Sequence, residues 1–291
     1  MTDTTVKYFH SGMTGAPVLS GTAGSLIAVL DACLVNGFAV SSVASLVVAG
    51  GIATATISAG HSAEVGSVVL VSGATPSGLN GEKKALTVGA GNTTLTFDAT
   101  GIADQTATGT ISLKLAPAGW SKAFSGSNLA AYKSLDVAAT GCYLRVDDTG
   151  ATDARVTGYE SMTGISTGSG GVFQSAAGGG YWPKASASGA TARNWLLVGD
   201  KRTFWLWVNT STTPTFENGF SIGFGDFLSY KSGDAWACAL HAPAASISAS
   251  TANSTSAIGY AVASAGAAAG SYAVPSFTSL GGAIPIGRYP E

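Results

Sequence analysis

Residues 195–208, with the sequence WLLVGDKRTFWLWV, predict a β-hairpin. The runs 195–198 and 203–208 are rich in the aromatic and branched side chains that strands favour. The segment between them, GDKR at 199–202, carries the residues that turns favour. This hairpin indicates a β architecture, and the segments on either side of it extend the same pattern.

The second strand of this hairpin is apolar on both sides. Side chains alternate along a strand, so Trp205 and Trp207 share one face while Phe204, Leu206 and Val208 share the other. A strand with two apolar faces is expected to be covered on both. One cover is the domain core, and the other is either a second layer of the same domain or another subunit.

Shorter strand patterns fill most of the chain before this hairpin. Two more hairpins are predicted, one pairing 120–124 with 129–135 and one pairing 142–146 with 155–160. Upstream, the segments 52–57, 67–71, 84–88, 94–97 and 108–115 predict short strands separated by Gly, Pro and Asn turns. Short strands at such regular spacing indicate a small sandwich or barrel.

One short helix is predicted near the N-terminus. Leu26, Leu30 and Leu34 recur at the helical spacing. Ser25 is in position to act as the N-cap, and Gly37 to end the helix in a left-handed conformation. This helix is expected to pack on a sheet.

Charge is scarce in this chain. Charged residues are 10% of the 291, and 14 Lys and Arg face 16 Asp and Glu. There is no basic cluster of the kind that binds nucleic acid, so we expect no nucleic-acid partner. Glycines and polar residues interrupt the uncharged stretch 32–63, which therefore predicts strands rather than a membrane span. A second uncharged stretch, 235–287, would suit a subunit that buries much of its surface against neighbours.

No cofactor or metal site is expected. Cys33, Cys142 and Cys238 are widely spaced, which predicts free thiols in a reducing compartment rather than a metal knuckle or a disulfide framework. The three histidines are isolated in the sequence. The N-terminus lacks the basic and apolar regions of a signal peptide.

The residues that match catalytic or metal-binding motifs are better explained by structural roles than by catalysis. The pattern G-x-S-x-G occurs at 164–168 and 219–223, but the glycines after Ser221 disfavour the helix that a hydrolase nucleophile needs. Asp147, Asp148 and Asp153 could ligate Ca²⁺, but they are also ordinary turn residues, and we favour the turn. The few glutamates mark no catalytic pair, so the chain is not expected to be an enzyme.

The aromatic residues and one low-complexity segment are the candidate contact regions. Residues 242–273 are almost all Ala, Ser, Thr and Gly, which suits a flexible loop or an arm that orders on a neighbour. The predicted interface residues are all aromatic: Tyr181, Trp182, Trp205, Trp207, Phe224, Phe227 and Trp236.

The segment 60–76, GHSAEVGSVVLVSGATP, followed by LNG at 79–81, resembles small β modules of tailed-bacteriophage virion proteins. Ser67 stands where those modules usually carry an aspartate, so we expect the acidic group to be dispensable. The strings YFHSGM (8–13), GAP (15–17), GDF (225–227) and YKSGDA (230–235) are similar to the same group of proteins.

This resemblance implies both an architecture and a function. Residues 1–49 and 116–291 would form a β-sandwich-like outer domain, with 50–115 inserted as a small β-sandwich or barrel module. The chain would be a structural subunit of the tail tip or baseplate. It would be assembled in the host cytoplasm and would contact copies of itself and other virion proteins. Two alternatives stay open: a tail adhesin that binds a host receptor or surface glycan, and a head decoration or head–tail joining protein.

Overall fold

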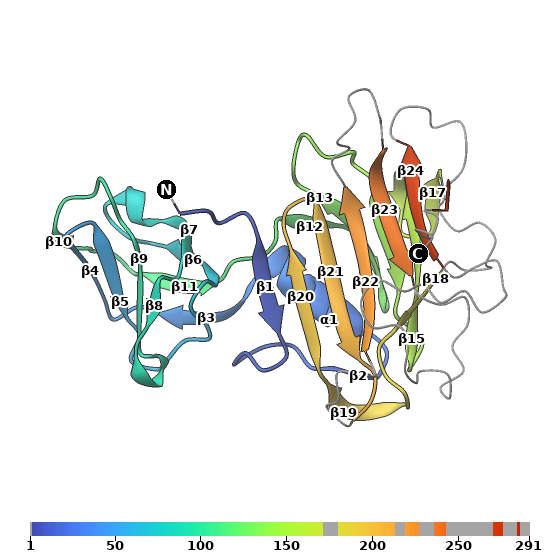
Figure 1. Ribbon diagram of the computed structural model, residues 1–291, viewed down its shortest axis with the longest axis horizontal. Helices are drawn as coiled ribbons and strands as arrows, with labels where there is room; N and C mark the ends of the chain where they lie inside the picture. Colours follow the sequence, from blue (N-terminus) through green and yellow to red (C-terminus); the bar gives the residue numbers. More distant parts are fainter. Residues whose placement is uncertain are drawn as a thin grey trace, which may run out of the picture.

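The computed structural model describes residues 2–170, 180–212, 219–226, 236–242, 270–275 and 284–285. Within these residues the chain is mainly β, as the sequence predicts. Two facing sheets and one short helix form a sandwich-like body, and a separate small β module lies beside it (Figure 1). No helix in this part of the chain is long and apolar enough to cross a membrane.

The first sheet of the body has seven strands in the described residues, in the order β1-β20-β21-β22-β23-β24-β25, all antiparallel. Their bounds are Lys7–His10 (β1), Trp195–Gly199 (β20), Thr203–Asn209 (β21), Gly219–Asp226 (β22), Trp236–Ala242 (β23), Gly270–Pro275 (β24) and Ile284–Pro285 (β25). The predicted hairpin 195–208 is confirmed as β20 and β21, the second and third strands of this sheet. The carboxylate of Asp200 closes its turn by accepting the N–H groups of Arg202 and Thr203 at 2.7 and 2.8 Å.

The second sheet of the body has the order β12-β13-β14-β15-β18 and contains both other predicted hairpins. Its strands are Trp120–Gly126 (β12), Leu129–Ser134 (β13), Tyr143–Asp147 (β14), Asp153–Tyr159 (β15) and Gly180–Pro183 (β18). Aromatic rings join it to the first sheet: Phe204 of β21 meets Trp120 at 5.5 Å and Trp182 at 6.1 Å, both edge to face. Two small pairs complete the body, β16 (Ser161–Gly164) with β17 (Thr167–Ser169) and β2 (Leu19–Gly21) with β19 (Gly189–Arg193).

The predicted helix exists, but it begins differently. Helix α1 spans Ser25–Leu30 and continues as a π-helical segment, η1 (Asp31–Asn36). Gly37 ends it with a positive φ of 67°, but its ψ of 174° is not the left-handed conformation that was predicted. Ser25 is not the N-cap as predicted. Gly24 takes that position, with φ 80° and no capping side chain. The free N–H groups of Leu26 and Ile27 instead donate to the carboxylate of Asp148, which lies far away in sequence.

Asp148 is held in place by a buried cation. Its carboxylate forms an ion pair with Lys184, and both side chains are fully buried. Lys184 also donates to the carbonyl oxygen of Thr22, just before the helix, at 2.7 Å. The turn between β14 and β15 is thereby bound to the start of α1.

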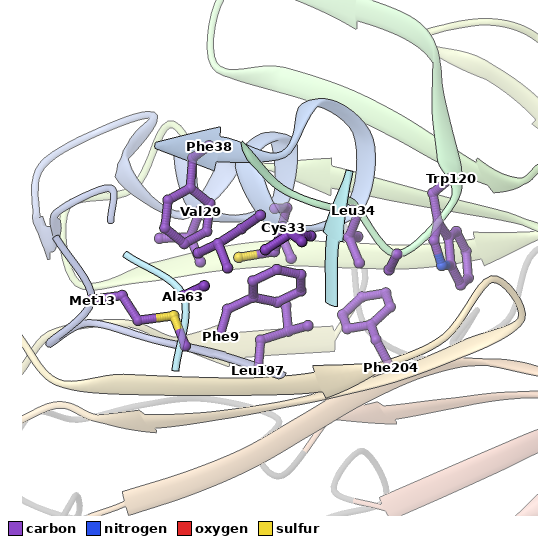
Figure 2. Packing of buried hydrophobic residues seen from close by; sticks show 14 of the residues in the cluster. Phe9, Met13, Val29, Cys33, Leu34, Phe38, Ala63, Trp120, Leu197 and Phe204 are labelled. Atoms are coloured by element: carbon purple, nitrogen blue, oxygen red, sulfur yellow. The ribbon is translucent and has the colours of Figure 1, made fainter. Parts of the chain in front are cut away.

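The helix covers the part of the first sheet that lies nearest the module. Figure 2 shows Val29, Cys33 and Leu34 pointing toward Phe9 and Leu197, which project from β1 and β20. All five side chains are almost entirely buried. The expectation of a short helix packed on a sheet is therefore confirmed.

The module consists of two small sheets. Their orders are β10-β4-β5-β9-β8 and β3-β11-β6-β7. The strands are Phe38–Ser42 (β3), Ser45–Ala49 (β4), Ile52–Thr56 (β5), Val68–Ser72 (β6), Gly81–Lys84 (β7), Thr87–Val88 (β8), Thr94–Asp98 (β9), Gln105–Thr106 (β10) and Ser112–Leu115 (β11), with single turns of 3-10 helix at Ser77–Leu79 and Ala90–Asn92. Since β3 and β4 pair only with module strands, the module begins at Phe38 rather than at residue 50.

Polar contacts attach the module to strand β1. His10 Nε2 lies 2.9 Å from Glu64 Oε1, and Tyr8 donates its hydroxyl to the carbonyl of Val65 at 3.1 Å. The hydroxyl oxygen of Ser67 accepts the N–H of Glu64 at 3.0 Å. An aspartate at position 67 could accept the same hydrogen bond, which gives a physical reason why serine is sufficient there.

Candidate interaction surface

The outer side of the β20–β21 hairpin carries exposed apolar side chains. Leu196, Val198 and Trp205 are 40%, 39% and 39% exposed, and Trp207 is half-buried. The register places Leu196 opposite Trp207 and Val198 opposite Trp205, so the four side chains form one continuous block. We call these four residues the tryptophan face.

Within the described residues the neighbouring strands widen the block without adding charged side chains of their own, and the Glu64 carboxylate of the module lies against Tyr8 and His10 at the β1 edge. On β1, Tyr8 lies opposite Val198 and His10 opposite Leu196. On the other side, the ring of His241 from β23 lies 5.5 Å from the Trp205 ring. Burial lowers the pKa of His241 below its usual 6.5, which favours the neutral imidazole at pH 7, so His241 adds no charge beside Trp205.

Glycines in β22 make room for the two indole rings. A Cβ atom at Gly223 would lie 2.8 Å from Cε3 of Trp205 and 2.9 Å from the carbonyl oxygen of Phe204. A Cβ atom at Gly219 would collide with the ring of Trp207. The G-x-S-x-G pattern at 219–223 is therefore explained by packing. Ser221 lies in the middle of a strand, opposite Trp207, not at a strand-to-helix turn.

The predicted interface residues lie in different parts of the structure. Trp205 and Trp207 lie on the tryptophan face. Tyr181 is half-buried, on the second sheet, with the Arg155 guanidinium 3.9 Å from its ring centre. Residue 227 lies outside the described residues, and for residue 236 only the backbone, in β23, is described.

Two of the predicted interface residues need correction. Trp182 is fully buried and Phe224 is 3% exposed, because both rings face the space between the two sheets. Their side chains form the core of this chain and are not available to a partner. Of the two adjacent aromatic residues, only Tyr181 is partly exposed.

Two members of the tryptophan face were missed. Leu196 and Val198 alternate with the buried Trp195 and Leu197 in β20, which is apolar throughout. The reasoning applied to β21 predicts an outward apolar row in β20 as well. The arm expected at 242–273 lies outside the described residues, apart from residue 242 and 270–273.

The other candidate groups have structural roles. Asp147 and Asp153 accept hydrogen bonds from Thr149 and Thr152 in the turn, as the turn interpretation predicts. Asp148 instead binds the distant helix and Lys184, which the turn interpretation did not include. In the part of the chain that the structure describes, no three His, Cys, Asp or Glu residues gather as a metal site would require.

A cleft of about 430 Å³ lies between module and body. Its four charged residues are paired with one another, Lys7 with Glu82 at 3.1 Å and Lys201 with Asp136 at 3.3 Å. Because these four charges are already paired within the chain, they do not indicate a binding site for a charged ligand. The tryptophan face therefore remains the strongest candidate site.

No protein-family model, curated protein or solved structure matches this chain.

Proposed function

We propose that this chain is a structural subunit of a tailed-phage virion, placed in the tail tip or baseplate, and that it acts by self-assembly. The observation that carries the proposal is the tryptophan face, an uncharged apolar block on the outside of a sheet whose inner side is already covered. Tryptophan is enriched in the fully buried centres of protein interfaces. The resemblance of residues 60–81 to phage virion modules supplies the biological setting.

The assembly would bury the tryptophan face against a second copy of the chain or a neighbouring virion protein. A stable interface needs about 800 Å² from each partner, which is more than four side chains supply. Neighbouring residues such as Tyr8 and His10 on β1 would have to contribute to this interface. Closed rotational symmetry is the default for such subunits, because it satisfies every copy. The proposal includes no catalytic role, no cofactor and no nucleic-acid partner.

Light scattering coupled to size exclusion tests self-association. Wild-type protein is expected to elute as an oligomer, and Trp205→Lys combined with Val198→Lys to elute as a folded monomer. Val40→Lys is the matched control, since Val40 is 72% exposed and belongs to the module strand β3 rather than to the sheet that carries the face. A wild-type chain that stays monomeric at high concentration would contradict the proposal.

The place in the particle needs a separate test. A tape-measure gene beside the coding gene would favour the tail tip, and a major capsid gene would favour head decoration or head–tail joining. Antibody labelling of purified particles would locate the chain directly. Labelling of the capsid shell alone would exclude the tail tip and baseplate.

A receptor- or glycan-binding adhesin is the second candidate. It is favoured by the partly exposed Trp205 ring, because aromatic rings stack on the apolar faces of sugars. A glycan array should then show hits that Trp205→Ala removes and Val40→Lys retains. An array without hits would leave self-assembly as the better explanation of the face.

A further inference from the structure

Cys142 and Cys238 lie together, although they are far apart in sequence. Both side chains line one small gap in the packing, together with Tyr159 and Phe224. Cys142 directly precedes β14 in the second sheet, whereas Cys238 belongs to β23 in the first. The pair therefore bridges the two sheets of the body, which face each other in Figure 1.

The backbone on both sides of this contact is anchored. Thr140 donates its N–H and its hydroxyl to the two carboxylate oxygens of Asp226, each at 2.6 Å. Asp226 ends β22 and is the register partner of Cys238. The N–H of Cys142 in turn donates to the hydroxyl oxygen of Thr140 at 3.4 Å. One carboxylate thus ties the segment before Cys142 to the strand beside Cys238.

The two thiols differ in accessibility and acidity. Cys142 is partly exposed, whereas Cys238 is 4% exposed. The neighbouring Cys238 thiol lowers the pKa of Cys142, against the opposing effects of burial and of the Asp226 and Glu160 carboxylates. The Cys142 thiol, together with burial, raises the pKa of Cys238. Cys142 is therefore the thiol that ionises first, and it is the more exposed of the two.

We propose that Cys142 and Cys238 are a redox-sensitive pair that closes to an intramolecular disulfide when the chain meets a small disulfide oxidant such as oxidised glutathione. The Cys142 thiolate attacks one glutathione sulfur, forming a mixed disulfide and releasing one glutathione thiolate. Cys238 loses its proton and attacks the Cys142 sulfur, which releases the second glutathione. The two protein thiols lose two electrons and two protons in total, and the oxidant takes up both electrons.

The consequence is a covalent link across the sandwich. The bond would close a loop of about 100 residues, and loops of that length gain much from cross-linking because the unfolded chain loses freedom. A chain made in a reducing cytoplasm would form the bond only after it leaves that compartment. The inference rests on the body of this chain alone and is independent of the assembly proposed above.

The test uses the full chain, purified in reductant and then exposed to oxidised glutathione. Thiol titration in denaturant is expected to fall from three free thiols to one, and peptide mapping to find Cys142 linked to Cys238. The melting temperature of the oxidised protein is expected to rise by about 5–15 °C. Cys142→Ser should abolish both the cross-link and the rise.

Cys33→Ala is the matched control, because Cys33 is fully buried beside the helix core and burial alone raises its pKa. This variant should keep the cross-link and the temperature rise on oxidation. Three thiols still free in the oxidised wild-type chain would overturn the proposal. A stable glutathione adduct on Cys142, or a bond between chains, would overturn it as well, and neither result depends on the folding of a variant.

Discussion

The inner and outer faces of strand β21 are both made of apolar residues but have different surroundings. On β21, Phe204, Leu206 and Val208 are fully buried against the helix and the second sheet. Trp205, one residue along, is 39% exposed. The larger ring therefore lies outside and the smaller one inside, which is the reverse of what burial within one chain would favour.

This difference separates the side chains that form the core from apolar side chains that remain on the surface. The inner face is covered by helix α1 and by the second sheet. The buried ion pair of Asp148 and Lys184 holds the start of this helix in place. The outer face has side chains of the same kind, yet within the described residues no charged side chain of β20, β21 or β22 lies over it. We conclude that the inner face specifies the fold, whereas the outer face carries the partly exposed side chains of the tryptophan face.

The largest loss of stability is expected from removing Asp148, which holds helix α1 over the inner face of the sheet. Asp148→Ala would leave the Lys184 ammonium group buried without its counterion and two helix N–H groups without an acceptor. An unpaired buried charge costs about 3–5 kcal/mol of the free energy of unfolding. Urea denaturation of the variant and of the wild type measures this loss.

A second variant distinguishes lost charge balance from lost packing. Asp148→Ala with Lys184→Met removes both charges, and the loss should then be clearly smaller than for Asp148→Ala alone. Equal losses would mean that the ion pair does not hold the cover of the inner face.

The direct comparison of the faces comes from neighbouring residues of β21. Phe204→Ala would open a cavity between Trp120 and Trp182 and cost about 3–4 kcal/mol. Trp205→Ala removes a larger ring but should cost only about 1 kcal/mol, because much of that ring is outside the core. Urea denaturation of the two variants at low protein concentration gives both values. Similar losses would show that the outer face is as much a part of the core as the inner one.

The sequence predicts the local parts of this fold well. All three hairpins of the body could be found because each depends on a turn and on alternation within a few residues, as in 195–208. The two-faced apolar character of β21 was also visible, and it led to Trp205 and Trp207.

Long-range features could not be predicted in the same way. The helix is capped by Asp148, which no pattern near Ser25 could reveal. Trp182 and Phe224 were assigned to the surface, because whether an aromatic strand residue faces inward depends on which sheet covers it. The module boundary was set too late, since only strand pairing shows that β3 and β4 belong to the module.

A smaller effect is expected from filling the space that holds Trp205 in position. Gly223→Ala would place a methyl group against the indole ring and against the Phe204 carbonyl. Overpacking of this kind costs about 1–3 kcal/mol, and it should also displace Trp205 and shift its fluorescence. Gly164→Ala is the matched control, because a Cβ atom there would meet nothing within 4 Å. An unchanged fluorescence spectrum in Gly223→Ala would mean that the glycine does not position the ring.

The smallest effect concerns the charges at the end of the tryptophan face. Asp136 binds Arg202 at 2.6 Å and Lys201 at 3.3 Å in the β20–β21 turn. The hydrogen bond from Arg202 lowers the pKa of Asp136 from the usual 3.8 to about 2. The folded state therefore favours the ionised carboxylate, so its contribution to stability is complete above pH 4 and is lost as the pH falls toward 2.

Asp136→Asn is expected to flatten the decline of the melting temperature between pH 4 and pH 2, since the variant has no proton to take up at this position. Arg202→Gln should flatten the same interval, because it removes the partner that lowers the pKa. Added salt should weaken the wild-type effect, as it screens partly exposed charges. If both variants keep the wild-type slope, this ion pair does not hold the turn, and the tryptophan face would depend for its shape on the inner packing alone.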